Sequence, residues 1–186
     1  MALDSRTSAA PERAEPPPAS LRHARTGTVG VDGQLPAGWL AESMSSVVVE
    51  DIAPPESSIV LEFQFDANMQ SDYVSLVIGP FLRPRRKDIY VSRVEMAVTS
   101  AENIDAAYFV VREWIENGAC VSQTARPIKL SDQFEVGIVG AVGDEQDRLL
   151  QPAISFRRKT PSAGRAHVIL RRPIFASIYD YPGWLK

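Results

Sequence analysis

Apolar residues recur at every second position along several segments of this chain. In residues 59–65, for example, the apolar Leu61, Phe63 and Phe65 alternate with the polar Glu62 and Gln64. In a strand this alternation sends the two sets of side chains to opposite faces, whereas a helix buries residues three or four apart. The pattern therefore predicts strands that each bury one face.

Turn signals divide most of the chain into such strands. The pair Asn117-Gly118 is typical of a tight hairpin turn and is expected to join residues 110–114 to residues 119–123. The expected strands cover residues 46–50, 59–65, 73–78, 89–98, 106–115, 119–123, 134–142, 153–158, and 166–172 with its continuation 174–178. Residues 100–105 and 144–150 are candidates for a short helical turn. About nine strands with this spacing predict an all-β sandwich or barrel.

The two ends of the chain differ from this strand-rich middle. Residues 1–25 carry Pro11, Pro16, Pro17 and Pro18 among small and polar residues, a composition too poor in large apolar groups to form a core. We expect an N-terminal arm over residues 1–25, one domain over residues 26–178 and a short tail over residues 179–186. The tail contains three aromatic residues that are candidates for docking on this domain or on another chain: Tyr179, Tyr181 and Trp184.

Composition excludes several classes of protein. A single cysteine allows no disulfide within the chain, and with only two histidines the usual zinc ligands are too few. The net charge of −3 gives no overall attraction for nucleic acid. No stretch approaches the roughly 20 apolar residues of a membrane span, and no signal peptide is recognised at the start. We expect a protein with no nucleic-acid partner and no membrane insertion, which stays where it is synthesised or leaves by cell lysis or as part of a particle.

The order of these parts resembles the jelly-roll carbohydrate-binding modules with a galactose-binding-like fold, above all those of tailed-phage and gene-transfer-particle virion proteins. The most distinctive match is the glycine-punctuated segment from Gly27 to Trp39, which is similar to the opening "G-A-V-x-G-x-x-G-x-L-P-x-x-W" of such domains. Shorter matches lie at residues 59–63, 73–76, 89–98, 109–114 with Asn117-Gly118, Phe156 and 167–173. The resemblance implies an all-β, two-sheet antiparallel jelly-roll sandwich, with Trp39 and Trp114 packed in its core. The N-terminal arm and the C-terminal tail lie outside it.

A sugar-binding site needs flat aromatic faces and short polar groups that pair with hydroxyls. Tyr73 and Tyr90 are candidate stacking residues. A polar loop between two expected strands offers further contacts or oxygen ligands for calcium, through Asp66, Asn68, Gln70 and Asp72. A basic run could meet acidic groups of a glycan or of a neighbouring subunit, through Arg83, Arg85 and Arg86. A solvated loop remains the alternative for both segments, and no cofactor other than calcium is expected.

Catalysis finds less support in the sequence. Glu95 and Glu113 are the nearest approach to the paired acids of a glycosidase, but both alternate with apolar residues as ordinary surface residues do. Cys120 lacks the neighbours of an activated nucleophile, and His167 is the one histidine outside the arm. No catalytic residue is assigned.

Two functions fit these observations. The first is a non-catalytic surface protein of a virion or phage-like particle, such as a head fibre, a head spike or a tail-associated component, whose jelly roll binds cell-surface polysaccharide. The second is a structural decoration or connector subunit of such a particle without glycan binding. In either case the resemblance implies a particle protein made in the bacterial cytoplasm. Its partners would include other particle proteins, reached through the N- and C-terminal segments, and further copies of the same chain.

Overall fold

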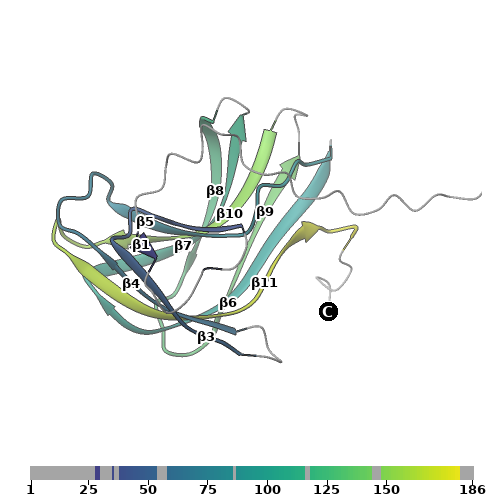
Figure 1. Cartoon of the computed structure of the whole chain (residues 1–186). Helices are drawn as coiled ribbons and strands as arrows, with labels where there is room; N and C mark the ends of the chain where they lie inside the picture. Colours follow the sequence, from purple (N-terminus) through teal and green to yellow (C-terminus); the bar gives the residue numbers. More distant parts are fainter. Residues whose placement is uncertain are drawn as a thin grey trace, which may run out of the picture.

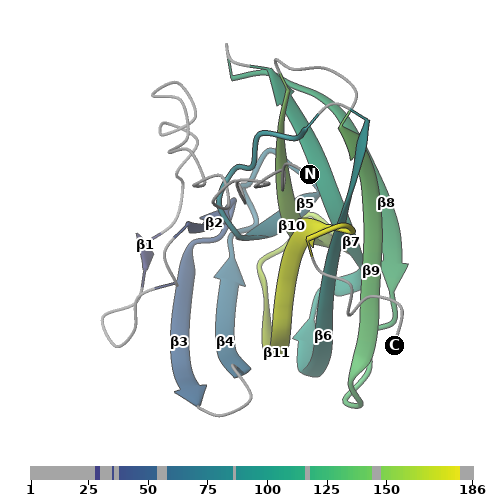
Figure 2. The ribbon, with the colours of Figure 1, turned by 90° about the vertical axis from the view of Figure 1, so that its right-hand side faces the viewer.

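The structure is a computed structural model, and it describes residues 28–29, 35, 38–53, 58–85, 87–115, 118–143 and 148–180. These residues form two sheets packed face to face, as Figures 1 and 2 show. Sheet A has six strands in the order β1 (Thr28–Val29), β3 (Ser46–Ala53), β4 (Ser58–Phe65), β11 (Gly164–Ser177), β6 (Asp88–Glu102) and β9 (Glu135–Gly143). Sheet B has five, in the order β2 (Trp39–Glu42), β5 (Tyr73–Ile78), β10 (Arg148–Arg158), β7 (Ile104–Ile115) and β8 (Cys120–Ile128).

This architecture confirms the expected all-β jelly-roll sandwich. All strand pairs are antiparallel except the two-residue pairing of β1 with β3, which is parallel. The expected hairpin is also confirmed, because β7 and β8 pair directly and Gly118 takes a positive φ of 88°. Apart from the pairs β3–β4 and β7–β8, most neighbouring strands come from distant parts of the sequence, so the sandwich brings together residues that no local pattern connects.

The core lies between the sheets and is built from the alternating apolar residues. On β4 the inward side chains Leu61, Phe63 and Phe65 are each about 1% exposed, as the period of two predicts. Phe63 of sheet A meets Phe156 of sheet B with ring centroids 4.9 Å apart. Trp39 is 9% exposed in the same core, where the family resemblance placed it.

Two expectations about local structure are corrected. Residues 100–105 form no helical turn, because β6 continues to Glu102 and β7 begins at Ile104, with Asn103 between them at a φ of 60°. The strand expected at 153–158 begins earlier, at Arg148, and runs through Pro152. Proline has no N–H to donate to a strand ladder. Pro152 is tolerated because the pairing of β10 with β5 begins only at the next residue, Ala153. On the other side of Pro152, Leu150 forms an isolated bridge with Leu82. The second candidate for a helical turn, residues 144–150, is a strand from Arg148 onward, and residues 144–147 lie outside the described residues.

Two glycines give a matched test of how tightly the sandwich is packed. A Cβ atom at Gly164 would collide with the Phe65 ring and lie 2.5 Å from the carbonyl oxygen of Glu102, whereas one at Gly140 would meet only the Tyr90 carbonyl oxygen, at 3.7 Å. We expect Gly164→Ala to lower the free energy of unfolding by about 1–3 kcal/mol and Gly140→Ala to change it by less than about 0.5 kcal/mol. Urea denaturation measures both, and equal stabilities of the two variants would contradict the expectation.

Candidate functional site

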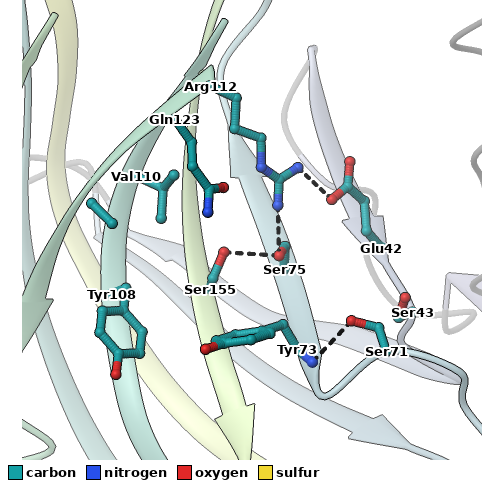
Figure 3. A pocket seen from close by; sticks show the side chains of 11 residues that line it. Glu42, Ser43, Ser71, Tyr73, Ser75, Tyr108, Val110, Arg112, Gln123 and Ser155 are labelled. Atoms are coloured by element: carbon teal, nitrogen blue, oxygen red, sulfur yellow. Dashed lines mark hydrogen bonds and ion pairs between the residues drawn. The ribbon is translucent and has the colours of Figure 1, made fainter. Parts of the chain in front are cut away.

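A pocket of about 350 Å³ opens on the outward face of sheet B. Figure 3 shows its side chains, which come from all five strands of that sheet and from the loops beside them. The lining residues are Glu42, Ser43, Ser71, Tyr73, Ser75, Tyr108, Val110, Arg112, Gln123, Ala125 and Ser155. We call this hollow the sheet B pocket. It is the outward set of the same alternation that fills the core: Ser75 lies between the inward Val74 and Leu76 of β5, and Arg112 follows the inward Val111 of β7.

A chain of polar contacts crosses the pocket. Arg112 Nη1 donates to Glu42 Oε2 at 2.6 Å, and Arg112 Nη2 donates to Ser75 Oγ at 2.7 Å. The Ser75 and Ser155 hydroxyls are 2.9 Å apart. Because β2 and β7 are separated by β5 and β10, the Arg112–Glu42 ion pair spans the width of three strand spacings. The two charges neutralise each other within the pocket.

Two tyrosines lie together at the other end of the pocket. The Tyr73 and Tyr108 rings are edge to face, with centroids 6.2 Å apart and planes inclined by 62°. Tyr73 is 42% exposed, and its backbone N–H donates to Ser71 Oγ at 3.0 Å. These rings present apolar faces beside the polar groups of Ser75 and Ser155, which is the combination that carbohydrate rings require.

A second ion pair lies next to the tyrosines, outside the lining itself. Arg157 donates through Nε and Nη2 to the two carboxylate oxygens of Asp105 at 2.8 and 3.0 Å. The hydrogen bond from Arg157 holds the pKa of Asp105 below its ordinary value, and the same pairing raises the pKa of Arg157. This guanidinium is therefore matched by a carboxylate, as that of Arg112 is.

The structure places the two tyrosines of the sequence analysis in different environments. Tyr73 lines the sheet B pocket. Tyr90 is 4% exposed on the inward face of β6, against Phe175, so its ring offers no open face for a sugar. Its hydroxyl accepts the backbone N–H of Arg85 at 2.8 Å, and burial raises its pKa.

The polar loop and the basic run lie outside the pocket lining. Asp66, Asn68, Gln70 and Asp72 are exposed, and the loop reaches the pocket only through its Ser71. Asp72 pairs with Arg158 at 3.2 Å. Arg85 pairs with Asp180 at 3.4 Å, and Arg83 is half-buried. Arg86 lies outside the described residues.

The docking candidates of the tail are only partly described. Tyr179 is 73% exposed, and its N–H donates to Ser177 Oγ at 3.1 Å. Tyr181 and Trp184 lie outside the described residues, as does the N-terminal arm. Docking through these segments stays a prediction.

The candidate catalytic groups are divided between the two sheets. Glu95 lies on sheet A and pairs with Arg93 at 2.8 Å, while Glu113 lies on sheet B. Cys120 begins β8, and burial raises the pKa of its thiol, which disfavours the thiolate. His167 lies on sheet A and is hydrogen-bonded to Thr99. None of these four residues lines the sheet B pocket.

In the described ranges of the chain, no three His, Cys, Asp or Glu side chains gather as ligands for a metal ion. No helix among the residues that the structure describes is long and apolar enough to cross a membrane.

Most residues of the sheet B pocket could not be recognised from the sequence. Glu42, Tyr108, Arg112 and Gln123 were not singled out, because they lie on three strands separated by up to 81 positions in the sequence. One signal was present: Arg112 interrupts the apolar run Phe109-Val110-Val111 of the expected strand 106–115. A charged residue in such a strand must reach a partner or solvent.

No family model matches the chain, and none of the curated proteins matches its sequence. Among solved structures the chain is similar to a carbohydrate-binding module described as "CBM4 structure and function", with a TM-score of 0.49 and 15% identity over 76% of this chain and 96% of that one.

Two further solved structures illustrate the range of similar proteins. The CBM22-1 xylan-binding domain of Paenibacillus barcinonensis Xyn10C has a TM-score of 0.48 and 11% identity over 79% of this chain and 90% of that one. The enzymatically active domain of tailspike protein 4 of bacteriophage CBA120 has a TM-score of 0.45 and 9% identity over 76% of this chain and 20% of that one. Since all three TM-scores are below 0.5, the case for a function rests on the pocket itself.

Proposed function

We propose that this protein is a non-catalytic binding protein that holds a glycan in the sheet B pocket. The observation that carries the proposal is the pairing of two tyrosine rings with a row of hydroxyl and amide groups in one open hollow. Sugar rings have apolar faces that pack on aromatic rings and hydroxyls that must find hydrogen-bond partners. Ser71, Ser155 and Gln123 supply such partners along the pocket.

The charges of the pocket favour a neutral glycan. Arg112 is the one cationic side chain among the lining residues, and Glu42 neutralises it at 2.6 Å. Arg157, next to the tyrosines, is neutralised by Asp105. An acidic sugar would have to compete with these carboxylates for the guanidinium groups, whereas a neutral sugar needs only the hydroxyls and amides.

The same residues support binding without hydrolysis. Glycoside hydrolysis by the usual mechanism needs two carboxyl groups that flank the scissile bond. Glu42 is the only carboxylate among the lining residues, and it is already paired with Arg112. The lining residues would therefore bind a sugar chain but would not place two carboxyl groups on either side of a glycosidic bond.

For the biological setting, we propose the surface of a virion or phage-like particle, where the pocket would bind cell-surface polysaccharide. The support is the similarity of residues 27–39 to the opening of virion carbohydrate-binding domains. In this setting the N-terminal arm and the tail would contact other particle proteins or further copies of the chain. Electron microscopy of assembled particles tests it: a domain buried between neighbours would indicate the connector role instead.

Binding of soluble glycans tests the proposed activity directly. In calorimetric titrations with neutral glycans such as xylan, mixed-linkage β-glucan and galactomannan, we expect the protein to bind at least one of them. The acidic glycans alginate and polygalacturonate should bind more weakly. Tyr108→Ala should weaken that affinity about tenfold, because it removes one aromatic face, equivalent to about 1.4 kcal/mol.

The matched control is Tyr179→Ala, which removes a tyrosine that is 73% exposed and lies outside the pocket lining. Its affinity should equal that of the unchanged protein. Equal losses in the two variants, or no binding of any neutral glycan including polysaccharides from bacterial surfaces, would refute the proposal.

A further inference from the structure

Sheet A has an apolar outward face at its β9 edge. Three outward side chains of β9 are more than half exposed, at 52% for Val136, 52% for Ile138 and 55% for Val142, and Ile89 beside them on β6 is 39% exposed. Val91 completes this surface, which we call the β9 patch; its Cα partner on β9 is Gly140. A contiguous group of exposed aliphatic side chains on one face usually marks a contact with another segment or molecule.

The middle of the β9 patch is hollow because Gly140 has no side chain. Gly140 is exposed between Ile138 and Val142, and a Cβ atom there would meet one neighbouring atom within 4 Å, the Tyr90 carbonyl oxygen at 3.7 Å. The surrounding aliphatic groups therefore leave space for a flat side chain to lie against the backbone of β9.

The described part of the tail leaves sheet A at the corner next to this patch. The N–H of Ile178 donates to the Ile89 carbonyl at 2.9 Å, and the chain then turns, with the Asp180 N–H donating to the Ser177 carbonyl at 3.2 Å. Asp180 also pairs with Arg85, just before β6. β6 begins at Asp88, which lies opposite Gly143 at the end of β9. The described part of the chain therefore ends close to Ile89, whose Cα partner on β9 is Val142.

We propose that residues 181–186 of this chain, Tyr-Pro-Gly-Trp-Leu-Lys, bind across the β9 patch of the same molecule. Six extended residues span about 20 Å, and the six steps from Val142 to Val136 along β9 span about the same length. The segment supplies the large apolar groups that the patch lacks, namely the rings of Tyr181 and Trp184 and the side chain of Leu185. Trp184 stands four residues after Asp180, about the separation between the end of β9 and the hollow at Gly140.

Side-chain packing rather than strand pairing carries this contact. Among the described strands, β9 is the last of sheet A, so no further strand pairs with its outer edge. Pro182 has no N–H to donate to a strand ladder, which favours packing of an extended segment over the sheet face. The proposal is independent of the proposed glycan binding, because the sheet B pocket lies on the opposite outward face of the sandwich.

A spin label at position 186 tests the contact. Cys120→Ser removes the native thiol, and Lys186→Cys then carries a nitroxide in the full chain. Paramagnetic broadening in amide NMR spectra is expected for Val136 to Val142 on β9 and not for β3, at the far edge of sheet A. Val142→Asp should abolish the broadening, since a carboxylate on the patch would be desolvated by the segment.

Val121→Asp is the matched control, because Val121 is 45% exposed on β8, the edge strand of the other sheet. This variant should keep the broadening of β9, and thermal unfolding followed by circular dichroism should show both variants folded. A sample that mixes labelled, unenriched protein with unlabelled, isotope-enriched protein should show no broadening. Broadening in that mixed sample would assign the patch to the tail of a second copy, and absence of β9 broadening in the labelled chain would show the patch unoccupied; either result overturns the proposal.

Discussion

Arg112→Ala is expected to lower the free energy of unfolding by about 2–4 kcal/mol and to remove most of the glycan affinity. The Arg112 and Glu42 side chains are only 11% and 22% exposed, so the variant leaves Glu42 as a poorly solvated charge without its partner. It also takes a donor from Ser75, which Arg112 contacts at 2.7 Å. Denaturation in urea measures the stability, and titration with the neutral glycan measures the binding.

Arg165→Ala provides the comparison, since it breaks an ion pair of similar length in a different environment. Arg165 and Glu102 are 3.0 Å apart but 63% and 65% exposed, and such a surface pair contributes little. We expect a change below about 1 kcal/mol and unchanged glycan binding. Comparable destabilisation by the two variants would mean that burial of the Arg112–Glu42 pair does not matter.

Phe156→Ala is expected to lower the free energy of unfolding by about 3–5 kcal/mol. Phe156 is 1% exposed at the centre of sheet B, and its ring meets that of Phe63 from sheet A at 4.9 Å. The substitution opens a cavity at the interface between the sheets. In a double-mutant cycle with Phe63→Ala, the loss of stability in the double variant should differ from the sum of the two single losses by about 0.5–1.5 kcal/mol. A loss below about 1 kcal/mol would show that the two sheets do not depend on this contact.

The fold was predictable because its strongest signals are local. The alternation in residues 59–65 and the Asn117-Gly118 pair each act over a few residues. The strand and the hairpin that they predict are confirmed, while Asn117 itself lies outside the described residues. The short strand β2 was missed because four residues, Trp39 to Glu42, carry too little alternation to be recognised. Pro152 hid the first half of β10, since proline ordinarily marks a turn or an edge.

The pocket was less predictable because it is assembled by strand order. Tyr73 was singled out as an aromatic residue, but nothing local connects it with Tyr108, two strands away in sheet B. Tyr90 shows the limit of residue type alone: it shares a face with Val94 and Met96 in the expected strand 89–98, and that face is the buried one. Alternation thus distinguishes inward from outward residues, while only the register shows which outward residues meet.

The ion pair between Arg112 and Glu42 bears on how a ligand would be received. It connects the first strand of sheet B, β2, with the fourth, β7, and so fixes the distance between the two sides of the pocket. The entropy of ordering these long side chains is lost when the protein folds rather than when a ligand arrives. A sugar chain would therefore bind to side chains that are already ordered, and its affinity would not be reduced by the entropy cost of ordering them.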